Sequence, residues 1–243
     1  MSCYNLLISE SVFSKGMIPI FDRIFNTLIA GGTWLTILKG LWATVQISAL
    51  SLLLGTLLGA VICGMRRSRW FLPRTAARLY IAVLRGSPVV LLLMLFYYVV
   101  FARSPLDAKL VAVIAFGMNT SAYVAELMRA ALDAVDLGQV EAARTLGFSR
   151  WTAFRLIALP QAARIAAPVY QSTIINLIQW TSVVGYVTIT DLTRVINPIC
   201  SRTMQPLMMI VTGILLYLAL AYMVNGLFAL ASFIRQRRRR ADS

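Results

Sequence analysis

Histidine is absent from this 243-residue chain, and acidic residues are scarce. Without histidine there can be no His-based metal site, no imidazole general base and no Ser-His-Asp triad. Asp and Glu number 9 against 23 Lys and Arg, and no paired carboxylates stand out that could serve acid–base chemistry. These absences argue against a catalytic role for the chain.

Other familiar motifs are missing as well. The three cysteines, Cys3, Cys63 and Cys200, lack metal-ligand spacing, so structural unpaired thiols are the simplest interpretation. No G-x-x-x-x-G-K-[ST] loop occurs, so the chain cannot hold nucleotide phosphates in that way. The first 30 residues show no pattern of a cleavable signal peptide, and no internal repeat is evident.

Hydrophobic residues dominate what is present. They make up 59% of the chain, only 13% of residues are charged, and the mean hydropathy is +0.77. A net charge of +14 would suggest nucleic acid in a soluble protein, but here the arginines flank apolar runs and no basic face carries interleaved aromatics. We therefore predict an all-α integral membrane protein with lipid, and not nucleic acid, around it.

Five apolar stretches are predicted to cross the bilayer, at residues 41–65, 79–101, 110–128, 165–189 and 207–234. Residues 1–33 are expected to form an extracytoplasmic segment with an interfacial helix, because Ile18, Phe21, Ile24, Phe25 and Leu28 recur at helical spacing. Residues 34–234 form the membrane domain, and residues 235–243 a basic tail. Within the first span, Gly55 and Gly59 form a G-x-x-x-G pair that allows close helix approach.

The basic residues predict the orientation. Residues 66–85, 129–164 and the C-terminal arginine run lie on one side of the predicted spans and hold most of the positive charge. Loops rich in Lys and Arg stay in the cytoplasm. The N-terminus is therefore expected outside and the C-terminus inside, which an odd number of spans requires.

The longest polar-rich interval runs from Gly138 to Pro160. Its pattern predicts two short helices. Gly138 and Gly147 occupy positions where a left-handed residue closes a helix, Ser149 is a good N-cap, and Pro160 is expected to end the second helix. Taken alone, this segment is most simply an amphipathic cytoplasmic hairpin.

Its sequence nevertheless resembles the E-A-A loop of ABC importer permeases, on the residues E-A-A-R-T-L-G from Glu141 to Gly147 and on Leu159-Pro160. An ordered series along the chain resembles the polar amino acid subfamily of these permeases: Arg85-Gly86-Ser87-Pro88, Tyr123-Val124-Ala125-Glu126, Arg129, Gly138-Gln139, Leu159-Pro160-Gln161-Ala162, Arg164, Pro168, Thr181-Ser182 and Asp191-Leu192-Thr193. The resemblance covers roughly residues 34–234.

This resemblance implies a permease of the type I importer fold in a bacterial inner membrane, transporting a polar amino acid or an amino-acid-like molecule. It implies three partners: a second permease, identical or paralogous, a cytoplasmic ATPase dimer, and an extracytoplasmic solute-binding protein. ATP and Mg would be bound by the ATPase, and this chain would carry no cofactor. The competing interpretation, an ATP-independent secondary transporter or channel, predicts mid-membrane charges and internal symmetry, and neither is evident.

The resemblance also assigns residues to the contact with the ATPase. The coupling helix would comprise Glu141, Ala142, Ala143, Arg144 and Leu146, with Gly147 reversing the chain. The alanines would allow close approach, and the two charged side chains would meet complementary charges. If the segment is only a hairpin, both charges are simply solvated.

Polar residues inside the spans are the candidates for the substrate pathway, because such groups are costly in lipid. The best cluster is Asn176, Gln179, Thr181 and Ser182, followed by Asn119 and Glu126. Members of the subfamily usually have Lys-Asp where this chain has Gln179-Trp180, so this subunit could be a non-binding half, or Trp180 could stack on the substrate. Interhelical hydrogen bonding is an equally good explanation for Asn176 and Gln179, and pairing with Arg129 is the simplest one for Glu126.

Overall fold

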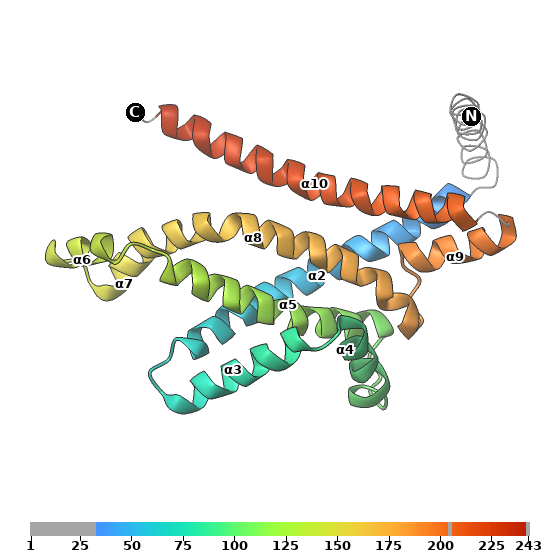
Figure 1. Ribbon diagram of the computed structural model, residues 1–243, viewed down its shortest axis with the longest axis horizontal. Helices are drawn as coiled ribbons and strands as arrows, with labels where there is room; N and C mark the ends of the chain where they lie inside the picture. Colours follow the sequence, from blue (N-terminus) through green and yellow to red (C-terminus); the bar gives the residue numbers. More distant parts are fainter. Residues whose placement is uncertain (1–32, 204–205, 242–243) are drawn as a thin grey trace, which may run out of the picture.

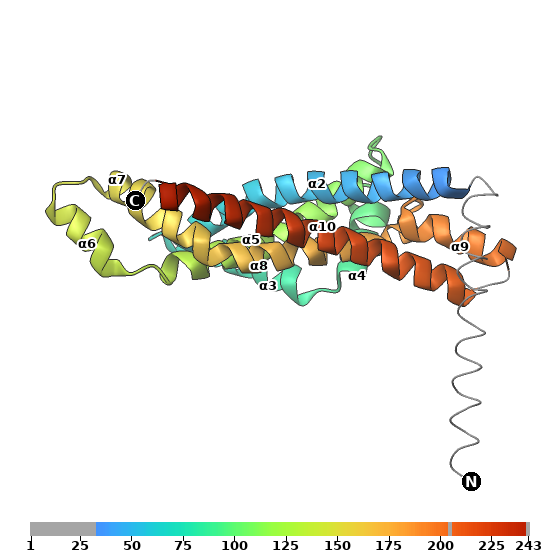
Figure 2. The same cartoon turned by 90° about the horizontal axis from the view of Figure 1, so that it is seen from above.

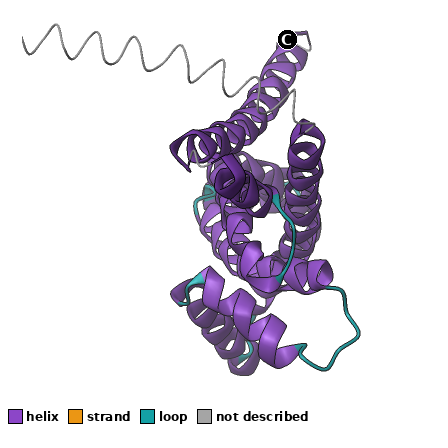
Figure 3. Ribbon diagram, turned by 90° about the vertical axis from the view of Figure 1, so that its right-hand side faces the viewer, coloured by secondary structure: helices purple, strands orange, loops and turns teal. Residues whose placement is uncertain are grey.

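The computed structural model describes residues 33–203 and 206–241, and within them every regular element is a helix (Figures 1 and 3). The α-helices are α2 (Thr33–Arg66), α3 (Phe71–Gly86), α4 (Val89–Leu95), α5 (Ala108–Asp133), α6 (Leu137–Thr145), α7 (Arg150–Ala153), α8 (Leu159–Trp180), α9 (Leu192–Thr203) and α10 (Pro206–Ala241). Two π-helical turns, η1 (Phe96–Val100) and η2 (Phe154–Ala158), and a 3-10 helix, η3 (Thr181–Val187), complete the list. The all-α prediction is confirmed.

α5 lies at the centre of the bundle and α10 at its edge. The most apolar window of α5 is 67% buried, whereas that of α10 is only 6% buried. Figure 1 shows α2 and α8 crossing on the two sides of α5, with α10 running along the outside. The apolar surface of α10 therefore faces lipid or another protein.

Small residues set the contact between α2 and α5, as the G-x-x-x-G pair predicts. A Cβ atom on Gly55 would lie 2.8 Å from Thr120 Cβ, and one on Gly59 would lie 2.8 Å from Val124 Cβ. From the other side, a Cβ on Gly117 would lie 2.7 Å from Leu54 Cδ2. Because these distances are far below van der Waals contact, only glycine allows the two backbones to approach this closely.

The predicted second span is wrong as a single helix. α3 already begins at Phe71 and ends at Gly86, and α4 with η1 leaves it at an angle of 109°. The break follows from Pro88, which disfavours helical backbone at Ser87, and Ser87 is extended with φ −99° and ψ 139°. Pro88 then sits at the N-cap of α4, where its missing N–H costs nothing.

The boundaries of the other spans also differ from the prediction. The predicted span 165–189 corresponds to α8, which ends at Trp180, and to the 3-10 helix η3 that follows. α10 continues to Ala241, so most of the predicted basic tail prolongs the last helix. By length and apolar composition α2, α5 and α10 can cross a membrane, and the bent pair would make a fourth span. The count of five spans remains a prediction, and the predicted interfacial helix lies outside the described residues.

The segments predicted to be cytoplasmic gather at one end of the bundle. Figures 1 and 2 show α6, α7, the connection between α2 and α3, and the C-terminal end of α10 together at this end. α9 and the first turns of α2 lie at the opposite end. At that far end, Asp191 caps α9, accepting hydrogen bonds from Arg194 N at 2.9 Å and Thr193 N at 3.2 Å. Burial raises the pKa of the Asp191 carboxyl above its ordinary value, against the effect of these N–H groups.

Candidate functional site

The helical hairpin formed by α6 and α7 projects from the end of the bundle (Figures 1 and 2). It begins at Asp136, whose side chain accepts a hydrogen bond from Gly138 N at 2.9 Å and caps α6. Gly138 therefore lies in the first turn of α6, and its predicted role in closing a helix is wrong. The N-cap aspartate, two residues before the start of the predicted interval, is the signal that was missed.

The turn between the two helices matches its prediction. Gly147 has a φ of +90°, and its N–H bonds to Arg144 O at 3.1 Å. Phe148 N then bonds to Ala143 O at 3.2 Å, which completes the reversal typical of a helix ending in a left-handed glycine. Ser149 caps α7 by accepting a hydrogen bond from Thr152 N at 3.1 Å.

The predicted end of the second helix at Pro160 is wrong. The chain passes from α7 through the π-helical turn η2 directly into α8, in which Pro160 occupies the first turn. Proline has no N–H and crowds the carbonyl four residues earlier, which disfavours an ordinary α-helical turn before it. The wider π turn absorbs this conflict and keeps the tip of the hairpin continuous with α8.

Most of the predicted coupling residues point away from the bundle. Glu141, Ala142, Arg144 and Leu146 are exposed, but Ala143 is only 3% exposed and packs inside the hairpin. Ala143 is therefore not available for the partner contact predicted for it. The hairpin is held to α8 by a hydrogen bond of 2.6 Å from Gln161 Nε2 to Gln139 Oε1.

Large apolar side chains surround the exposed charges of the hairpin. Leu146 is 79% exposed and Leu137 71%, and Trp151, Phe148 and Leu156 are exposed beside them. A projecting surface of this kind indicates a protein interface. The sequence prediction included only Leu146 of this group, although the apolar residues were visible in a polar interval. We call residues 137–160 the coupling tip.

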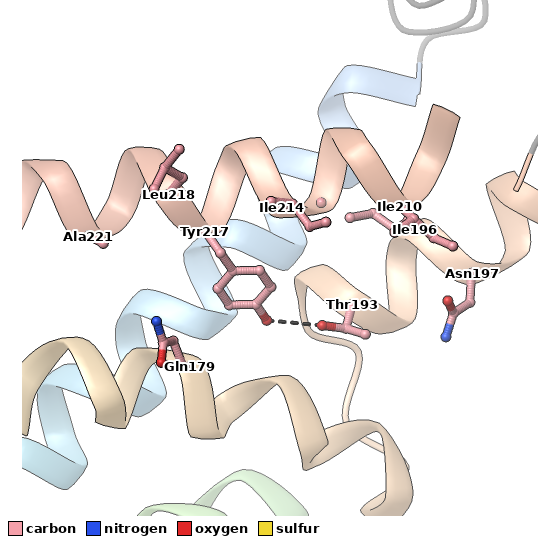
Figure 4. A pocket seen from close by; sticks show the side chains of 10 residues that line it. Gln179, Thr193, Ile196, Asn197, Ile210, Ile214, Tyr217, Leu218 and Ala221 are labelled. Atoms are coloured by element: carbon pink, nitrogen blue, oxygen red, sulfur yellow. Dashed lines mark hydrogen bonds between the residues drawn. The ribbon is translucent and has the colours of Figure 1, made fainter. Parts of the chain in front are cut away.

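Among the pathway candidates, Gln179 borders a pocket of about 390 Å³ between the end of α8, α9 and α10 (Figure 4). Its polar neighbours are Thr193, Asn197 and Tyr217, and the Tyr217 hydroxyl lies 3.0 Å from Thr193 Oγ1. Sequence reasoning missed Tyr217, although a hydroxyl inside an otherwise apolar run was a usable signal. Asn176, three residues before Gln179, is also exposed.

Trp180 lies on a different side of α8 and takes part in an aromatic contact whose ring planes are tilted by 47°. Its ring centroid lies 5.2 Å from that of Tyr123 on α5, and the Arg85 guanidinium carbon lies 5.0 Å from the same Tyr123 ring. Arg85 is the penultimate residue of α3, directly before the sharp bend. Two contacts therefore connect these elements: the cation–π contact links the bend to α5, and the aromatic contact links α5 to α8.

The remaining candidates have structural partners or deep burial. Thr181 is fully buried and its hydroxyl bonds to Ile178 O at 2.7 Å, while Ser182 is half-buried. Glu126 accepts hydrogen bonds from Arg129 at 2.6 and 3.1 Å, which confirms the predicted pair. Asn119 is 2% exposed, and its Oδ1 finds no hydrogen-bond partner in the described part of the chain. Asn119 thus lies in the bundle interior and Glu126 in a half-buried ion-pair cluster, and neither lines the Gln179 pocket.

Comparison with known proteins identifies the family of this chain. The family described as "Binding-protein-dependent transport system inner membrane component" matches residues 51–240. The chain belongs to this family. It is a multi-pass membrane permease of the ABC importer class, as the E-A-A loop and the ordered series predicted.

The alignments with known relatives span most of this chain and most of each relative. It is 34% identical to the probable amino-acid ABC transporter permease protein YckA of Bacillus subtilis, across 82% of this chain and 89% of that one. It is 32% identical to the histidine/lysine/arginine/ornithine transport system permease protein HisM of Salmonella typhimurium, across 87% and 94%. A crystal structure of an amino acid ABC transporter with histidines superimposes with a TM-score of 0.77 at 30% identity, covering 86% and 97% of the two chains.

Proposed function

We propose that this permease imports a polar amino acid or an amino-acid-like small molecule by alternating access, driven by a separate ATPase dimer that grips the coupling tip. The observation that carries the proposal is the tip itself: a projecting hairpin whose apolar and charged side chains are exposed at one end of the bundle. Relatives named for amino acid transport support the substrate class. The chain's role is transport, and hydrolysis of ATP belongs to the partner.

Movement of the coupling tip would be transmitted to the substrate pathway through rigid helices. The π turn η2 makes the tip continuous with α8, and α8 carries Gln179 and Trp180 at its far end. Closure of the ATPase dimer would displace two such tips toward one another and tilt α8 relative to α5. This tilt would open the Gln179 side of the permease alternately to the two sides of the membrane.

The other partners follow from the exposed ends and faces. The largely uncovered apolar surface of α10 suits lipid and a second permease subunit, identical or paralogous. The end with α9 is expected to face outward and to receive an extracytoplasmic solute-binding protein. The end with the coupling tip is expected to lie in the cytoplasm of a bacterium, with the N-terminus outside, because the basic residues gather there.

Reconstitution tests function and orientation together. Proteoliposomes containing the permease complex are loaded with ATP, and a labelled amino acid is supplied outside with the cognate binding protein. Uptake is expected only with both ATP and binding protein present. A single cysteine replacing exposed Arg237, in a background with the native cysteines replaced, should react only with maleimide on the ATP side. Equal uptake without ATP would support the secondary-transporter alternative and reject the proposal.

We further propose that Trp180 contributes to the substrate pathway, held in place by its ring contact with Tyr123, which Arg85 contacts in turn. Trp180→Ala is expected to raise the KM for transport about fivefold or more with little change in the amount of complex, because an aromatic contact contributes about 1 kcal/mol. Trp180→Phe should restore most of the affinity. Unchanged KM in the alanine variant, or equal loss in both variants, would assign Trp180 to packing alone.

A further inference from the structure

An arginine-lined pocket lies at the end of the bundle that carries the coupling tip, near the base of that tip. Its volume is about 390 Å³, and it is formed by the end of α2, the start of α3 and the end of α5. Five arginines and one aspartate line it: Arg66, Arg67, Arg74, Arg78, Arg129 and Asp133. None of these residues belongs to the coupling tip or to the pathway candidates, although Arg129 pairs with one candidate, Glu126.

The two carboxylates at this site, those of Glu126 and Asp133, already form ion pairs with arginines. Arg129 bonds to Asp133 at 2.6 Å as well as to Glu126, and Arg67 also pairs with Asp133. Arg66 Nε lies 3.4 Å from the second oxygen of Glu126. Three of the five guanidinium groups pair with these two carboxylates and the other two pair with none, so a strong positive potential remains in the pocket.

The two arginines of α3 supply the unbalanced charge. Arg74 donates two hydrogen bonds to a neutral group, the carbonyl oxygen of Ser68, at 2.7 and 3.0 Å. Arg78, one turn later, makes no ion pair or hydrogen bond to any residue in the described ranges. An anion entering the pocket would therefore find a free guanidinium at Arg78 and further donors around it.

Apolar side chains next to the pocket locate it at the surface of the membrane. Trp70, directly before α3, and Phe71, its first residue, are 78% exposed, and Leu72 in the same first turn is 79% exposed. Aromatic and apolar side chains in such a position insert at the headgroup level of a bilayer. Farther along α3, Leu79 and Val83 continue the exposed apolar surface. The pocket consequently lies where lipid phosphates are found, with a path for acyl chains beside it.

We propose that this pocket binds the phosphate-bearing headgroup of an anionic phospholipid, with the acyl chains lying along the exposed apolar surface of α3. Bidentate arginine–phosphate contacts and the adjoining membrane surface favour a lipid over a soluble anion. The bound headgroup would neutralise the repulsion among the arginines of α2, α3 and α5. Because α5 ends at Asp133, three residues before the cap of α6, the lipid would stabilise the base of the coupling tip and support transport.

The test uses the whole importer complex in nanodiscs and compares Arg78→Gln with Arg164→Gln, which changes an exposed arginine outside both the pocket and the coupling tip. Phosphatidylglycerol bound per complex is measured by native mass spectrometry after dilution into phosphatidylcholine. Arg78→Gln is expected to weaken retention about fivefold, as each basic residue near an anionic lipid contributes roughly 1 kcal/mol. Arg164→Gln should retain the lipid as the wild type does. ATP-driven uptake of the wild type should rise when phosphatidylglycerol replaces phosphatidylcholine.

Three outcomes would overturn the proposal. Equal retention by both variants would show that the pocket is not the site. Displacement of the lipid by millimolar inorganic phosphate without loss of uptake would assign the pocket to a soluble anion. Loss of ATPase co-purification in Arg78→Gln, with lipid retention unchanged, would assign the arginines to an acidic surface of the partner protein. These outcomes are independent of whether the substrate is an amino acid.

Discussion

Gly147→Pro is expected to reduce ATP-driven uptake to the background of liposomes without the complex, while the permease still inserts into the membrane. Gly147 has a φ of +90°, and proline is confined near −65°, so the turn cannot form with proline. Proline also removes the N–H that bonds to Arg144 O. Each defect costs on the order of 1–3 kcal/mol locally, enough to disorder a short hairpin. Uptake and ATPase co-purification are measured on equal amounts of inserted permease.

Gly138→Ala is the matched control for this variant. Gly138 lies in the first turn of α6 without a positive φ, and a Cβ there would meet only Asp136 Oδ1 at 3.3 Å. Alanine should therefore preserve or slightly stabilise the helix, and uptake should stay near the wild-type level. Wild-type uptake by Gly147→Pro would show that the coupling tip does not need this turn and would remove the main support for coupling through it.

Gly59→Leu is expected to prevent assembly of a stable bundle. The close approach of α2 and α5 leaves no room for a side chain, since even a Cβ would lie 2.8 Å from two atoms of Val124. Overpacking typically costs 1–3 kcal/mol, and a leucine between two closely packed backbones should reach or exceed the upper end of that range. We expect the variant to aggregate in detergent, measured as the monodisperse fraction in size-exclusion chromatography at equal expression.

Gly64→Leu on the same helix provides the comparison. No atom lies within 4 Å of a Cβ placed on Gly64, which borders an open apolar pocket between α2 and α8. This variant should elute as the wild type does. If Gly59→Leu is equally monodisperse, α2 and α5 do not pack as closely as the structure shows. If both variants aggregate, the effect comes from leucine in α2 and not from the contact with α5.

Features that depend on a few neighbouring residues were predictable from the sequence. The left-handed turn at Gly147 and the cap at Ser149 follow from local backbone and hydrogen-bonding preferences. The pair of Glu126 and Arg129 follows from helical spacing, and the glycine spacing in α2 indicated a close contact without naming its partner. The order of short motifs along the chain led to the permease family before any geometry was known.

Local reasoning failed where a neighbouring element overrides a local preference. Pro160 signals the end of a helix, yet the chain widens into a π turn and continues, because packing against α5 and α6 holds α8 in place. Gly138 taken alone resembles a residue that ends a helix, but Asp136, two residues earlier, caps α6 and places Gly138 inside that helix. Ala142 and Ala143 are identical in sequence terms, and only the packing of α6 against α7 determines which of them faces a partner.

The sequence by itself determined that this protein is a helical membrane permease with a coupling loop, because composition, charge placement and motif order are properties of the chain in one dimension. The tertiary structure alone decided which residues meet. It bends the predicted second span by 109°, places Tyr217 beside Gln179, and brings arginines from three helices around one pocket. These juxtapositions join residues far apart in the chain, and their geometry depends on helix angles that no local pattern specifies.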